Sequence, residues 1–67
     1  MIAPLSELRD RIVRILACNG EYVYGLVIGY ISPENNILSE ESIIVQAALG
    51  ELAEFYPADI HELEILA

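Results

Sequence analysis

Residues 11–38 of this chain read RIVRILACNGEYVYGLVIGYISPENNIL, and they decide its fold. Two apolar runs flank Asn19-Gly20, the kind of dipeptide that most strongly signals a tight turn between antiparallel strands. Both residues tolerate the positive φ that a type I′ turn requires, so the pattern predicts a two-residue hairpin loop. We therefore expect one strand at about 11–18 and a second at about 21–31.

The second run carries two glycines, Gly25 and Gly29, which lie four residues apart and so on one face of a regular strand. Missing side chains at two such positions let a strand bend sharply. Together with the turn glycine, Gly20, they predict a small, strongly curved β structure. The opposite face would carry three tyrosines, which we interpret as ordinary strand and interface residues rather than as a base-stacking platform. These are Tyr22, Tyr24 and Tyr30.

The composition predicts a single domain, 1–67, that needs help to bury its apolar residues. A chain of 67 residues buries only about 60% of its unfolded surface, yet 55% of this one is hydrophobic and its mean hydropathy is +0.47. One cysteine allows no intrachain disulfide, and there is no Cys/His set for a structural metal. We therefore expect the chain to oligomerise, and we expect no cofactor.

Charge is the second strong feature, with a formal net charge of −8 and no lysine. The only cations are Arg9, Arg11 and Arg14, and nine acidic residues follow them without another cation. Because Lys and Arg supply most non-specific affinity for nucleic acids, the chain is poorly equipped for phosphate binding. The acidic charge is better interpreted as keeping an apolar assembly in solution.

The sequence also predicts where the protein acts. No apolar run approaches the roughly 18 residues that a membrane span requires. The N-terminus shows no basic segment followed by an apolar one, so no signal peptide is predicted. We expect a cytoplasmic protein with no membrane partner.

The remaining segments give signals of unequal strength. Pro4 suits the first turn of a helix, so a short helix is expected at about 4–10. Propensity alone favours a second helix at 43–56, although strands are possible there. Residues 60–66 alternate and predict a terminal strand whose polar side, Glu62 and Glu64, faces solvent.

The glycine-rich stretch resembles the first motif of the Sm-like proteins, the family of LSm and Hfq-type small β-barrels. That motif has a glycine at the end of a hairpin turn, alternating hydrophobic residues and glycines, an aromatic residue, an asparagine and a leucine. The matching residues here are Gly20, Val23, Gly25, Val27, Gly29, Tyr30, Asn35 and Leu38.

The resemblance implies a mainly β fold, in which a short N-terminal helix precedes a strongly bent, five-stranded antiparallel Sm-like (SH3-like) barrel. The last three strands would then lie at about 36–45, 46–56 and 60–66. In the family the fourth strand of one subunit pairs with the fifth of the next, which implies a homo-oligomeric ring of about five to seven subunits. Without the resemblance, the alternative is an α+β helix–hairpin–helix–strand domain.

The resemblance also implies an RNA-associated ring that is not an enzyme. The candidate RNA-binding residues are Asn35, Tyr30, Pro33, Arg9, Arg11 and Arg14. The chain departs from the motif at Ile31, where the family has an aspartate, and at Pro33, where it has a base-stacking side chain. An Arg-Gly turn near 55–59 is also missing. The alternatives are a protein-binding ring scaffold or adaptor, and an acidic nucleic-acid mimic that inhibits its target.

Catalytic chemistry has little support in the sequence. A nucleophile, a base and an orienting group must come within reach of one another, and the chain offers one cysteine, Cys18, and one histidine, His61. We interpret them as a packed thiol and a strand histidine. The glutamate pairs lack the loop of about six oxygen ligands that calcium needs, so neither a catalytic nor a metal site is predicted.

Overall fold

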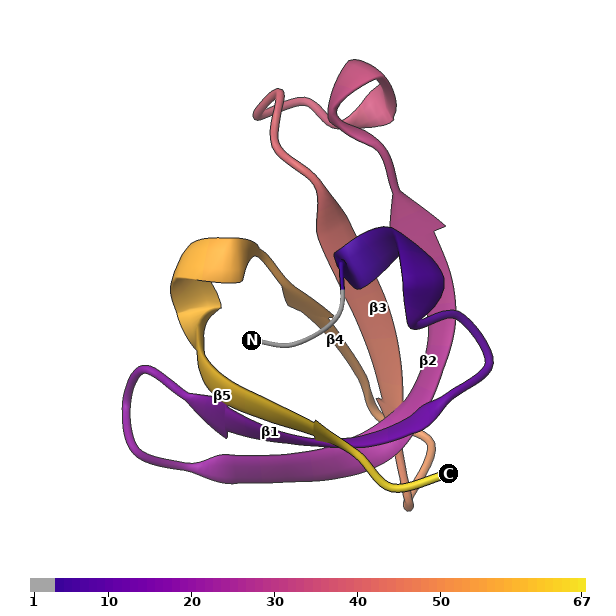
Figure 1. Cartoon of the computed structure of the whole chain (residues 1–67), viewed down its shortest axis with the longest axis vertical. Helices are drawn as coiled ribbons and strands as arrows, with labels where there is room; N and C mark the ends of the chain where they lie inside the picture. Colours follow the sequence, from indigo (N-terminus) through magenta and orange to yellow (C-terminus); the bar gives the residue numbers. More distant parts are fainter. Residues whose placement is uncertain (1–3) are drawn as a thin grey trace.

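The computed structural model describes residues 4–67, which form one antiparallel sheet of five strands (Figure 1). The first three residues of the expected 1–67 domain lie outside the described residues. The strands are β1 (Ile12–Ala17), β2 (Tyr22–Ile31), β3 (Ser42–Ala47), β4 (Leu52–Phe55) and β5 (Ile60–Ile65). Their order is β4-β3-β2-β1-β5. The sheet is strongly bent but it does not close into a barrel, because β4 and β5 remain as its two edges. Within residues 4–67 no helix is long and apolar enough to cross a membrane.

The bend depends on Gly25, as the sequence suggested. A Cβ atom at this position would overlap the carbonyl oxygen of Gln46 and would lie 2.7 Å from Cγ1 of Val45. Only a residue without a side chain lets β2 pass so close to β3. In Figure 1, β2 curves from the β1 hairpin to the β3 side of the molecule and so joins the two halves of the sheet.

A β-bulge in β2 overturns the expected face pattern. Val27 pairs with Val45, but Gly29 pairs with Ile44, so one extra residue is inserted at this point. Such an insertion reverses which face the following side chains occupy. Gly29 therefore does not share a face with Gly25.

The same bulge moves one of the three tyrosines. Tyr30 pairs with the buried Ile43 and packs against the core, whereas Tyr22 and Tyr24 are exposed on the other face. The predicted single tyrosine face is therefore wrong, because strict alternation over 22–31 ignores the extra residue.

The core lies in the concave side of the bent sheet and includes two leucines from the N-terminal segment. Leu5 and Leu8 are fully buried there. The other core residues are Val13, Ile15, Val27, Ile43, Val45, Phe55 and Leu63. The expected helix at 4–10 is only a 3-10 turn, η1 (Leu5–Glu7). Asp10, at φ 68°, breaks any continuation, and so short a segment gains too few hydrogen bonds to form a stable α-helix.

Both hairpins use the same turn, and it differs from the type I′ turn predicted at Asn19-Gly20. Within 4–67 the only non-glycine residues with positive φ are Asp10 and Ser39, so Asn19 cannot occupy a type I′ turn. Instead the loop has three residues, and the N–H of Ala17 donates to the carbonyl of Glu21 over 2.8 Å. Ala47 and Glu51 repeat this arrangement at 2.8 Å in the β3–β4 hairpin.

The two turns share the pattern Ala-x-x-Gly-Glu, with Gly20 at φ 89° and Gly50 at φ 88°. This is the geometry of a type I turn followed by a left-handed residue. As a result, Cys18 lies in an exposed loop and not at the end of a strand.

The segment whose assignment was left open, 43–56, is a hairpin and not a helix. Ile43, Val45 and Phe55 turn inward from facing strands, so burial on the bent sheet outweighs the helix propensity of the alanines and glutamates. The predicted strand 36–45 begins only at Ser42, because η2 (Pro33–Asn35) and a loop occupy the preceding residues. The α+β alternative is therefore wrong.

Candidate functional site

The exposed side of β5, β1 and β2 is the candidate functional surface, which we call the outer face. We define it by Ile12, Arg14, Leu16, Tyr22, Tyr24, Leu26, Glu62 and Glu64. These residues line up across the strands, since Ile12 pairs with Leu26 and Leu16 lies between Tyr22 and Glu62. Tyr22 and Tyr24 are 53% and 55% exposed. The sheet thus presents aromatic and aliphatic side chains to solvent beside an acidic edge strand.

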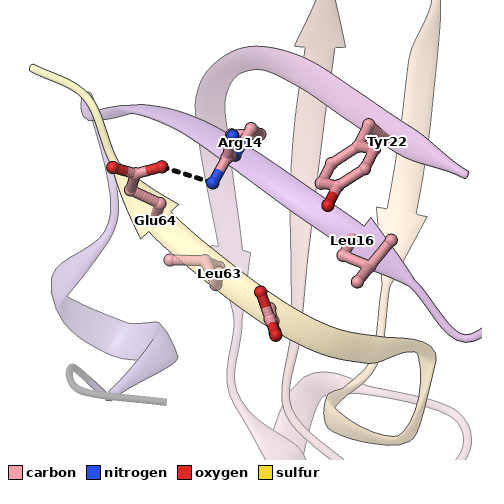
Figure 2. A pocket seen from close by; sticks show the side chains of 6 residues that line it. Arg14, Leu16, Tyr22, Leu63 and Glu64 are labelled. Atoms are coloured by element: carbon pink, nitrogen blue, oxygen red, sulfur yellow. Dashed lines mark ion pairs between the residues drawn. The ribbon is translucent and has the colours of Figure 1, made fainter. Parts of the chain in front are cut away.

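Arg14 is the centre of this face. Its guanidinium lies 2.7 Å from Oε1 of Glu64 and 5.3 Å from the centre of the Tyr22 ring. Figure 2 shows Arg14 between these two partners, with the ion pair dashed. The polar contact with the Tyr24 hydroxyl, and secondly the charge of Glu64, raise the pKa of Arg14. Arginine is already charged throughout the usual pH range, so the contacts hold its position rather than change its charge.

A pocket of about 150 Å³ opens beside Arg14 (Figure 2). It is lined by Arg14, Leu16, Tyr22, Glu62, Leu63 and Glu64. Two carboxylates and one guanidinium give the lining a formal charge of −1. Apolar carbon comes from Leu16 and the Tyr22 ring, since the side chain of Leu63 belongs to the core. Acidic and apolar groups in one cavity favour a ligand that is cationic and partly hydrocarbon.

The predicted RNA-binding residues are not brought together. Tyr30 donates to Oε1 of Glu41 over 3.0 Å, and Asn35 Nδ2 donates to the Ser32 hydroxyl over 3.1 Å in an exposed loop. Pro33 begins η2 in the same loop. Figure 1 places η2 at the opposite end of β2 from the β1–β2 turn.

The other two arginines also lack a shared site with that loop. Arg11 Nε donates to the carbonyl oxygen of Ala67 over 3.1 Å, next to the C-terminal end of β5. Arg9 is exposed between η1 and β1. Arg11 and Arg14 are therefore each held by a different local contact.

The structure assigns the organising role in the 32–41 loop to Asn36, which the sequence analysis passed over in favour of Asn35. Asn36 Oδ1 accepts from the Tyr56 hydroxyl at 3.2 Å and from the Leu38 N–H at 3.2 Å. Its Nδ2 donates to the fully buried Ser42 hydroxyl at 3.1 Å, and Ser42 donates to Oε2 of Glu54 at 2.7 Å. The network ties the loop to β3 and β4. In the sequence the only signal was the Asn-Asn pair, which does not distinguish its two members.

The described part of the chain brings no metal-binding cluster together. No three His, Cys, Asp or Glu side chains in residues 4–67 gather closely enough to hold a metal ion. Cys18 and His61 are both exposed, and His61 lies where the pairing of β1 with β5 shifts register.

Partial burial, followed by the hydrogen bond to Glu41, raises the pKa of Tyr30, which keeps this phenol protonated.

Comparison with known proteins adds no family to this description. The chain matches no protein-family model, no curated protein and no solved structure. The outer face and its pocket must therefore be interpreted from their own chemistry.

Proposed function

We propose that this protein is a non-enzymatic, Sm-like assembly module that forms a homo-oligomeric ring and holds a protein partner on its outer face. The observation that supports this most is the outer face itself, where exposed tyrosine, leucine and isoleucine side chains share one side of the sheet with a pocket that has an acidic lining. Exposed apolar patches rimmed by polar residues are typical of protein-binding surfaces.

The ring is supported by the edges of the sheet. Within residues 4–67, β4 and β5 both have an unpaired side, and an unpaired edge is open to pairing with another strand. Pairing of β4 with the β5 of a second copy is the arrangement that the resemblance to Sm-like proteins implies. It would also cover part of the apolar surface that a 67-residue monomer leaves exposed.

A protein partner is favoured over RNA because two of the three arginines are already held by contacts within the chain. Arg14 is paired with Glu64, Arg11 is bound to the Ala67 carbonyl, and nine acids follow Arg14 in the chain. An RNA strand would meet net negative charge over most of this molecule. A mimic of nucleic acid needs its acids in one array, whereas those of this chain are distributed over several loops and strands.

Native mass spectrometry with and without a six-residue oligo-uridine tests the proposal. We expect a single closed oligomer of about five to seven subunits, unchanged in mass when the oligo-uridine is added. A monomer or dimer at all concentrations would overturn the ring. Added RNA mass on the oligomer would overturn the preference for a protein partner.

A further inference from the structure

We infer that the outer-face pocket receives one basic side chain, arginine or lysine, from an apolar segment of a protein partner. The inference rests on the proposed function, because it names the chemistry of the partner that this surface would hold. Three properties of the pocket support this inference: its charge, the side chains that line it, and its position near other exposed apolar residues.

The charge balance of the pocket leaves one carboxylate without a cation. Arg14 and Glu64 neutralise each other at 2.7 Å, and theirs is the only ion pair among residues 4–67. Glu62, on the same edge strand, keeps its negative charge at the pocket wall. Among residues 4–67 no cationic side chain is paired with Glu62. A cation from a partner would neutralise it.

The walls suit a cationic side chain better than a small inorganic cation. Leu16 offers hydrocarbon against which the methylene stem of a lysine or arginine can pack, as such stems do on apolar surfaces. The Tyr22 ring already holds the Arg14 guanidinium at 5.3 Å, which shows that a cation is accepted next to it. A volume of about 150 Å³ equals the space of about five waters, which is enough for the end of one long side chain.

The exposed apolar residues near the pocket indicate what else the partner segment should contain. Along β1 the apolar Ile12 lies four residues from Leu16, which is about 13 Å in a strand. Ile12 pairs with Leu26, and both are exposed, at 44% and 37%. An extended partner that places its basic residue in the pocket would reach this second apolar site about four residues away. The expected motif is a basic residue and a large aliphatic residue separated by three others.

A matched pair of peptides tests the inference. The first is a nine-residue Gly/Ser peptide with one arginine and one leucine four positions apart, and in the second an uncharged citrulline replaces the arginine. Binding is followed by amide NMR shifts of the ¹⁵N-labelled protein. We expect the arginine peptide to shift the signals of Leu16, Tyr22 and Leu63, and to bind about fivefold more tightly than the citrulline peptide, as one charge contact would give.

Two protein variants locate the effect. Glu62→Gln should weaken the arginine peptide about fivefold and leave the citrulline peptide unchanged. Glu51→Gln removes the same charge from the exposed β3–β4 turn and should change neither by more than about twofold. Both positions are exposed, so both variants should fold, and their NMR spectra verify this.

Three results would overturn the inference: equal affinity for the two peptides, equal losses in the two variants, or shifts confined to residues outside the pocket. Displacement of the peptide by oligo-uridine at the same amides would also count against it, because an anion would then occupy the site. Native mass spectrometry tests ring assembly independently of peptide binding. Peptide binding by a monomer would overturn the ring and leave the pocket assignment standing.

Discussion

At the scale of single residues, alanine substitutions at Gly25 and Gly29 should have opposite effects on stability, although both glycines lie in β2. A methyl group on Gly25 would overlap the Gln46 carbonyl, whereas on Gly29 it would lie 3.6 Å from Ile44 Cγ1, an ordinary contact. Gly25→Ala should therefore lower the free energy of unfolding by about 1–3 kcal/mol, the usual cost of overpacking. Gly29→Ala should raise it by about 0.5–1 kcal/mol, because alanine loses less backbone entropy than glycine on folding.

Urea denaturation of the two alanine variants and the parent checks both values. Equal destabilisation by the two substitutions would show that the bend of β2 depends on general flexibility and not on the close approach of β3 at Gly25.

Tyr30 predicts how stability changes at alkaline pH. Its pKa is raised, first by partial burial and then by the hydrogen bond to Glu41, so the folded state favours the neutral phenol. The contribution of this group is fully present below the ordinary tyrosine pKa of about 10. It is lost as the pH rises through the raised value, since the phenolate is disfavoured in the folded state. Thermal denaturation between pH 9 and 11 should show a decline that is shallower in Tyr30→Phe.

Tyr22→Phe is the matched control for that experiment, because Tyr22 lies on the outer face and away from Glu41. It should keep the steep decline of the parent. The same slope in all three proteins would mean that Tyr30 contributes nothing to the alkaline loss of stability.

The asparagine pair illustrates what single residues can and cannot reveal in a sequence. The value of Gly25 was predictable, because a glycine inside an apolar strand usually marks a bend or the close approach of another backbone. The division of roles between Asn35 and Asn36 was not, since it depends on where Ser42 and Tyr56 lie after folding. The pocket could not be predicted from the sequence either, because its lining comes from three strands and depends on the β1–β5 register.

At the scale of elements, the 32–41 loop is held to the β3–β4 hairpin by the Asn36 network. Asn36→Ala removes the hydrogen bonds to the Ser42 and Tyr56 hydroxyls, although Ser42 keeps its bond to Glu54. It should lower the free energy of unfolding by about 1–3 kcal/mol, the net worth of two hydrogen bonds at about 0.5–1.5 kcal/mol each. Asn35→Ala, which loses only an exposed contact with Ser32, should change it by less than about 0.5 kcal/mol.

Chemical denaturation ranks the two variants, and hydrogen exchange of the β3 amides shows whether the loop protects that strand. An Asn35→Ala variant as destabilised as Asn36→Ala would contradict the assignment of the network to Asn36.

Elements were predicted well where a local pattern and the tertiary environment agree. The strands β1 and β2 lie within the expected ranges because Asn19-Gly20 separates two apolar runs, and β5 does so because its residues alternate. The hairpin at 43–56 was ambiguous because its alanines and glutamates favour a helix locally, and only the facing β2 makes strands preferable there. The bulge near Ile28 had only Gly29 as a local signal, because a glycine inside a strand can mark a bulge, a bend or a close approach alike. The bulge moved Tyr30 to the core side.

At the scale of the whole molecule, two opposing features must be reconciled: a sheet with open edges and exposed apolar side chains, and a charge of −8 on each chain. Burial of apolar surface favours assembly, whereas each added copy brings like charges together. Salt screens the repulsion, with a Debye length that falls from about 10 Å at 0.1 M to about 3 Å at 1 M. Apolar contacts are not weakened in this way.

Assembly of this protein should therefore increase with sodium chloride. Sedimentation at 20 mM and 500 mM salt should show a larger oligomer fraction at the higher concentration, since screening removes repulsion between copies. The variant with Glu40→Gln and Glu51→Gln, both in exposed turns, reduces the formal charge from −8 to −6 and should assemble at lower salt than the parent. Binding driven by phosphate contacts would weaken with salt instead, so the direction of the change separates protein assembly from an RNA-dependent one. An oligomer that dissociates as salt is added would mean that ion pairs, and not the apolar surface and strand edges, hold the copies together.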